Sequence, residues 1–139
     1  MGDAPKRFGA VFLGGALGTG ARIGLDALIP HTDTTFPWST LLINIVGSFA
    51  LGLLVARDFR WPSSWLRAGV RTGIIGGFTT FSAVIASLVT LTDGNEVGLA
   101  ALYLVLSLLL GFGAATAGVA AGGALGRASV RAMPLETDE

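Results

Sequence analysis

A stretch of 21 residues without a charged side chain, Thr72 to Thr92, constrains this sequence most. A helix of about 20 apolar residues is long enough to cross the hydrocarbon core of a bilayer. The first half of the stretch, however, carries Gly73, Gly76 and Gly77 and then a run of hydroxyl side chains. Irregular backbone at membrane depth is tolerated only where it is buried in protein or lines a wet cavity. The pattern therefore predicts a transmembrane helix broken near mid-membrane, with an ion site at the break.

The composition indicates a membrane protein, because 52% of the residues are hydrophobic and only 13% are charged, whereas soluble domains carry about 25% charged residues. The expected fold is all-α, a four-span transmembrane helical subunit. A cleavable signal peptide is the competing interpretation of the first span, but a bare four-span architecture leaves no exported domain to deliver. We expect one four-helix transmembrane channel domain over residues 1–132 and a disordered acidic tail over 133–139, with spans at about 8–28, 36–56, 72–92 and 97–126.

The distribution of positive charge predicts the topology. Eight of the nine Lys and Arg residues lie before the first span, between the second and third, or after the fourth. These three regions share one side of a four-span protein. By the positive-inside rule both termini are cytoplasmic, in a multi-pass protein of the cell (inner) membrane. The ninth cation, Arg22, lies near the far end of the first span.

Small residues recur every four positions in each span, a spacing that lets helix backbones approach closely. Examples are Gly14 and Gly18 in the first span, and Gly118 and Gly122 in the fourth. Most of these glycines are explained by tight packing within one bundle. Four short helices have little interior of their own, so we expect a lumen for a solute to form between subunits of an oligomer.

Polar side chains follow one face of the second span, where Thr40, Asn44 and Ser48 are spaced four apart. A buried Asn in lipid serves either helix association or a polar pathway, and the spacing leaves both open. Tyr103 and Ser107 share a face of the fourth span in the same way. Any single hydroxyl can bond back to its own helix, but polar residues in three spans favour a pathway.

The second, third and fourth spans contain no Asp, Glu, Lys or His. A proton-coupled transporter needs a titratable group inside the membrane, so this class is disfavoured. Catalysis is disfavoured too, because no base accompanies a nucleophile and no ligand cluster could hold a catalytic metal, so we expect no enzyme. The remaining equipment is hydroxyls, one amide and the electropositive edges of aromatic rings, and such donors favour an anion.

Three motifs resemble the signature of the Fluc (CrcB-type) fluoride channels, in order and at the family's length. The first span contributes Gly14-Gly15-Ala-Leu-Gly18 and, three residues on, Ala21-Arg22. The last two motifs are together quite specific: Phe36-Pro37-Trp38-Ser39-Thr40-Leu41 with Asn44, Gly47-Ser48-Phe49 and Gly52, and then Gly76-Gly77-Phe78-Thr79-Thr80-Phe81-Ser82.

The resemblance implies a fluoride-selective passive channel that exports cytoplasmic fluoride. It further implies an antiparallel dimer with two pores and a structural sodium ion, not transported, at the dimer interface. Carried over by motif, the sodium ligands are the backbone carbonyls of Gly76 and Thr79. The implied fluoride pore residues are Asn44, Phe81, Ser82, Tyr103 and Ser107, with Arg22 at the vestibule.

Two features depart from the family pattern. The motif usually continues Phe-Ser-Thr-Phe, whereas here Ala83 and Val84 replace the threonine and the second phenylalanine. The strong bias of Lys and Arg to one side is also unusual for a chain that must insert in both orientations. We therefore hypothesise that the antiparallel second subunit is a paired homologue of opposite bias, with a second copy of this chain as the alternative.

Two rival functions remain. A small multidrug-type proton-coupled exporter also has four short spans, but it needs a membrane-embedded carboxylate, and Asp26 comes only near the outer end of the first span. A non-conducting membrane scaffold or partner subunit is the third class. A nucleic-acid role is not expected, because a juxtamembrane cluster of arginines indicates topology and contact with anionic lipid.

Overall fold

The computed structural model describes residues 3–29, 35–57 and 61–131, with side chains described as far as residue 127. Within these ranges the chain is all-helical, as predicted, and contains no strand. The elements are α1 (Ala4–Leu28), α2 (Trp38–Ala56), α3 (Ser64–Ala68), the π-helical segment η1 (Gly69–Ile75), α4 (Gly76–Phe78), α5 (Phe81–Asp93) and α6 (Val97–Arg131).

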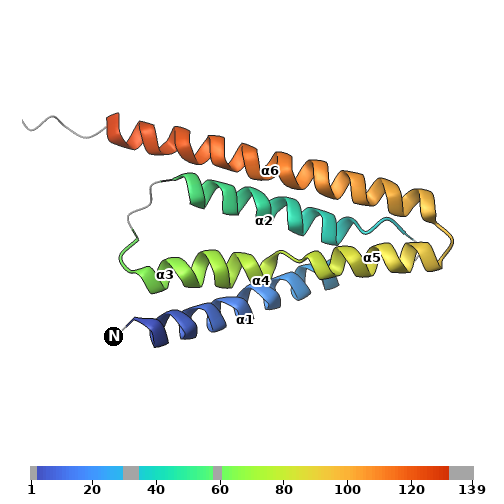
Figure 1. The fold of residues 1–139 in the computed structure, drawn as a ribbon, viewed down its shortest axis with the longest axis horizontal. Helices are drawn as coiled ribbons and strands as arrows, with labels where there is room; N and C mark the ends of the chain where they lie inside the picture. The colour runs from blue at the N-terminus through green and yellow to red at the C-terminus, as the bar shows by residue number, and fades with distance from the viewer. Residues whose placement is uncertain (1–2, 30–34, 58–60, 132–139) are drawn as a thin grey trace, which may run out of the picture.

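Four helical rods are long and apolar enough to cross a membrane: α1, α2, the run from α3 to α5, and α6. The rods lie side by side in the order α6, α2, α3 to α5, α1 (Figure 1). The start of α1, the end of α2, the start of α3 and the far end of α6 lie at the same end of the bundle (Figure 1). The protein is therefore a multi-pass membrane protein.

The helix bounds differ from the predicted spans mainly at one end of the bundle. The third rod begins at Ser64, where the side chain of Ser63 accepts a hydrogen bond from the backbone N–H of Leu66 and so caps the first turn. The loop containing His31 and the acidic tail over 133–139 lie outside the described residues. The tail prediction is therefore untested.

Glycines bring two pairs of helices into backbone contact, as their spacing predicts. A Cβ added to Gly73 in η1 would lie 2.9 Å from the carbonyl oxygen of Val11 in α1. A Cβ added to Gly118 in α6 would meet the backbone of Phe49 and Leu53 in α2. These contacts explain why α1 packs mainly against η1 and α2 mainly against α6.

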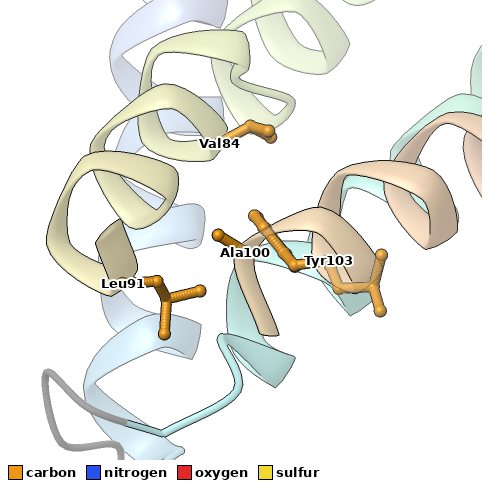
Figure 2. Packing of buried hydrophobic residues seen from close by; sticks show 5 residues of the cluster. Val84, Leu91, Ala100 and Tyr103 are labelled. Atoms are coloured by element: carbon orange, nitrogen blue, oxygen red, sulfur yellow. The ribbon is translucent and has the colours of Figure 1, made fainter. Parts of the chain in front are cut away.

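The apolar core lies where α2, α5 and α6 meet. It consists of Leu41, Val84, Leu91, Ala100 and Tyr103, and Tyr103 is 0% exposed. Figure 2 shows Val84 and Leu91 on α5 directed towards Ala100 and Tyr103 on α6. Most other large apolar side chains are exposed, as expected of helices surrounded by lipid.

Arg71 fastens the third rod to the end of α2. Its guanidinium donates a hydrogen bond to the carbonyl oxygen of Leu54, in the last turn of α2, and lies 6.0 Å from the centre of the Trp61 ring. The last four carbonyls of a helix lack partners within the helix, and they carry the negative end of its dipole. The Arg71 side chain therefore supplies a hydrogen-bond donor to a carbonyl at the end of α2, and this contact fixes the position of η1.

Candidate functional site

The third rod is interrupted at Thr79 and Thr80. Their backbones are extended, with φ and ψ of −81° and 150° at Thr79 and −150° and 125° at Thr80. The interruption therefore lies just after the double glycine rather than within it. The Thr80 hydroxyl accepts a hydrogen bond from the backbone N–H of Ala83 at 3.2 Å, which caps the start of α5.

Asn44 on α2 bridges the interruption. Its Oδ1 accepts a hydrogen bond from the backbone N–H of Thr80 at 2.8 Å, and its Nδ2 donates to the carbonyl oxygen of Thr80 at 3.0 Å. The side chain thereby replaces the helical partners that the extended Thr80 has lost. One N–H of the Asn44 amide is left over, because the group has two donors.

A cavity of about 280 Å³ lies beside the interruption. It brings together four of the predicted site residues, Asn44, Thr79, Phe81 and Ser107, from three different rods. Ser107 contributes a buried hydroxyl that has no hydrogen-bond partner among the described residues. The full lining is Asn44, Ser48, Thr79, Thr80, Phe81, Val84, Leu104, Ser107, Leu108 and Gly111.

A second cavity, of about 220 Å³, lies further along the same face of α2. Asp26 and Ser39 are on its wall, and the Ser39 hydroxyl donates to Oδ1 of Asp26 at 2.5 Å. The predicted polar face of α2 thus serves both cavities, since Thr40 lines this one. The full lining is Asp26, Thr35, Pro37, Ser39, Thr40, Ala83, Ala86, Ser87, Thr90 and Leu91.

Tyr103 lies between the two cavities instead of on the wall of either. Its ring is edge-on to Phe36, with centroids 5.5 Å apart. Ser87 on the second cavity and Ser107 on the first are both near its hydroxyl, but neither makes a well-aligned hydrogen bond with it among the described residues. A buried hydroxyl without a partner costs about 1–3 kcal/mol, so this position suits a water molecule or an ion.

The remaining predicted residues lie outside both cavities. The Ser82 hydroxyl is exposed and lies 2.9 Å from the Thr80 hydroxyl. Gly76 is exposed, and a Cβ added there would meet nothing within 4 Å. Arg22 is half-buried on α1, and its Nε has no hydrogen-bond partner among the described residues.

The sequence reasoning missed the roles of Thr80, Asp26 and Thr19. Thr80 could have been found as a helix cap, because a threonine directly before an apolar helical run is a start signal. The pairing of Asp26 with Ser39, and the hydrogen bond from the Thr19 hydroxyl to the Gly77 carbonyl at 3.3 Å, join different rods. No local pattern in the sequence indicates them.

The fold and site define a four-span helical membrane protein with an interrupted third rod and, beside the interruption, a cavity whose polar lining is uncharged. Residues 9–119 match the family described as "CrcB-like protein, Camphor Resistance (CrcB)". The chain belongs to this family, as the three sequence motifs predicted.

Individual relatives carry a more specific name. The chain is 43% identical over 122 residues to the "Fluoride-specific ion channel FluC" of Thermus thermophilus, covering 86% of this chain and 98% of that protein. It is 44% identical over 112 residues to the protein of the same name in Xanthomonas euvesicatoria, covering 78% and 84%. The "Fluoride-specific ion channel FluC 1" of Mycobacterium bovis is 41% identical over 108 residues, covering 76% and 82%.

Proposed function

We propose that this chain is a subunit of a fluoride-selective passive channel that exports cytoplasmic fluoride. The observation that carries the proposal is the cavity beside the interruption, where Asn44, Ser107 and Phe81 present neutral donors to one space. The family relatives named as fluoride-specific channels support the choice of ion.

The donors suit a small anion that must exchange its water shell for protein contacts. The spare N–H of Asn44 and the unpartnered hydroxyl of Ser107 can donate to it, and the edge of the Phe81 ring is electropositive. α5 begins at Phe81, so the positive end of its dipole also lies at this cavity. Neutral donors hold an anion less deeply than a buried cation would, and conduction needs binding that is weak enough to release.

The path would continue from this cavity past Tyr103 to the second cavity. Ser107 lines the first cavity and Ser87 the second, and both are near the Tyr103 hydroxyl. That hydroxyl has no hydrogen-bond partner among the described residues, so it can donate to a passing ion. Val84, which stands where the family has a second aromatic residue, is 5% exposed and packs in the core beside Tyr103. We infer that Tyr103 and Ser107 supply the donors that this chain lacks at position 84.

A structural sodium ion would be held by the backbone carbonyls of Gly76 and Thr79. The residues fit a cation, since Gly76 is exposed and open to a neighbouring group, and Thr79 has left the helical conformation. Carbonyl oxygens are suitable ligands for a hard cation. When bound, the ion would supply a fixed positive charge close to the anion path.

The proposed assembly is an antiparallel dimer. The Phe81 side chain is 68% exposed on one subunit although it lines the cavity, which favours a second subunit that covers it. The one-sided distribution of Lys and Arg favours a paired homologue as that subunit, with the termini of this chain in the cytoplasm. Topology reporters fused to the C-terminus test this: equal signals from both sides of the membrane would remove the reason for a paired homologue.

Efflux from liposomes tests the function. Purified protein, alone and with its paired homologue, is reconstituted into vesicles loaded with potassium fluoride, and release is followed with a fluoride electrode after valinomycin is added. We expect rapid fluoride release without a proton gradient, and no release from chloride-loaded vesicles. Release that requires a proton gradient would favour the exporter, and absence of release in both preparations would favour the scaffold.

A further inference from the structure

The hydrogen bonds at the interruption divert two backbone donors from two particular carbonyls. In a continuous α-helix each N–H bonds to the carbonyl four residues earlier, so Thr80 would serve Gly76 and Ala83 would serve Thr79. Here the N–H of Thr80 donates to Asn44 Oδ1 at 2.8 Å, and the N–H of Ala83 donates to the Thr80 hydroxyl at 3.2 Å. The carbonyls of Gly76 and Thr79 therefore lose their usual donors.

Three other carbonyls around the interruption are supplied with donors. The carbonyl of Ile75 accepts from the N–H and the hydroxyl of Thr79, each at 3.0 Å. The carbonyl of Gly77 accepts from the Thr19 hydroxyl, and the carbonyl of Thr80 accepts from Asn44. Gly76 is exposed and Thr79 is partly exposed on one subunit, so a ligand can approach the carbonyls that lack these donors.

We propose that Asn44 and Thr80 are positioning residues for a monovalent cation. By holding two N–H groups elsewhere, they free the carbonyl oxygens of Gly76 and Thr79 for the ion. An N–H directed at either oxygen would compete for its lone pairs and would place a positive hydrogen beside the cation. The inference rests on the sodium site of the proposed function and assigns to Asn44 a role separate from contact with fluoride.

The test measures sodium binding through stability, without any flux measurement. The full-length protein in detergent, as its native dimer, is unfolded thermally while sodium chloride is varied against N-methyl-D-glucamine chloride at constant ionic strength and without fluoride. A ligand that binds only the folded state raises Tm with its concentration. We expect Tm of the unmodified protein to rise with sodium and to saturate.

Two matched pairs of variants isolate the diverted donors. Thr80→Val removes the hydroxyl with little change of shape, whereas Thr80→Ser keeps it; Asn44→Leu removes the acceptor, whereas Asn44→Asp keeps it. If a returned backbone hydrogen bond contributes about 1 kcal/mol, the half-saturating sodium concentration should rise about fivefold in Thr80→Val and Asn44→Leu. In Thr80→Ser and Asn44→Asp the half-saturating sodium concentration should stay within about a factor of two of that of the unmodified protein. Thr116→Val is the control, because the Thr116 hydroxyl bonds only to Gly113 of its own helix.

The outcomes separate the two ideas. If Tm of the unmodified protein does not depend on sodium, the sodium site is wrong and the inference falls with it. If that Tm does depend on sodium but Thr80→Val has the same half-saturating concentration as Thr80→Ser, the site stands and the positioning role is wrong. If Asn44→Leu fails to fold, the two Thr80 variants still decide the question. Thr80→Val only replaces the hydroxyl by a methyl group, and Thr80→Ser only replaces the methyl group by a hydrogen.

Discussion

Replacing Gly18 by Ala inserts one methyl group between α1 and the third rod. The added Cβ would meet the carbonyl oxygen of Ile74, and it would lie 2.9 Å from both the Ile74 carbonyl carbon and the Phe78 backbone nitrogen. All three are backbone atoms, which cannot rotate aside as a side chain can. Gly20, two residues further along α1, is the matched control, because a Cβ there would meet nothing within 4 Å.

The expected magnitude follows from the two positions. Gly to Ala in a helix contributes about 1 kcal/mol of stability by propensity, and this gain is common to both variants. At Gly18 the helices must also move apart by about 1 Å to reach ordinary carbon contact distances, and overpacking of this kind costs about 1–3 kcal/mol. The difference between the variants isolates the steric cost. At about 2–4 °C per kcal/mol for a chain of this size, it should exceed about 2 °C in Tm.

The assay is thermal unfolding of both purified variants in the same detergent and salt. Tm of Gly18→Ala should lie below Tm of Gly20→Ala, and Gly20→Ala should equal or exceed the unmodified protein. Equal Tm values for the two variants would refute the close backbone contact between α1 and the third rod. The reverse order would refute it more strongly.

Three further predictions use the same protein preparations. Arg71→Gln removes the contact with the end of α2 and should destabilise the protein by about 1–3 kcal/mol, whereas Arg67→Gln, at an exposed residue of α3, should change stability by less than about 0.5 kcal/mol; equal Tm values would contradict this. Phe81→Leu removes the ring edge at the cavity and should slow fluoride efflux by about tenfold, while Phe112→Leu, at a phenylalanine that is 72% exposed on α6, should leave efflux unchanged. Equal loss in both would place the effect in the lipid-facing surface. Ser107→Ala removes a hydroxyl that has no partner among the described residues, so Tm should stay within about 2 °C while efflux falls; a large drop in Tm with normal efflux would make this hydroxyl structural.

Much of the fold was predictable because a bilayer permits few solutions. Four apolar runs of sufficient length, and the requirement that backbone groups in lipid be satisfied internally, leave little besides four helices. The glycine spacing likewise predicted close helix contacts, which Gly73 and Gly118 make. The π-helical form of η1 was not predicted, since no residue pattern between Gly69 and Ile75 distinguishes it from α-helix.

The candidate site was predictable in its members but not in their pairing. The spacing of Thr40, Asn44 and Ser48 placed them on one face of α2, and the structure places all three on cavity walls. Whether Asn44 served helix association or a polar pathway was left open. Asn44 serves helix association through its two hydrogen bonds to Thr80. Its side chain also lies on the cavity wall, so the remaining N–H of its amide is left for the polar pathway.

The sequence by itself determined the four spans, the family and the neutral character of the polar groups, because length, hydropathy and residue type are local properties of the chain. Only the tertiary structure decided that the interruption falls at Thr79 and Thr80, that Asn44 closes it from α2, and that Val84 packs beside Tyr103 in the core. The physical reason is that an extended residue inside a membrane must find its hydrogen-bond partners on another helix. The identity of that partner depends on which helices lie side by side, and spacing along one chain does not specify it.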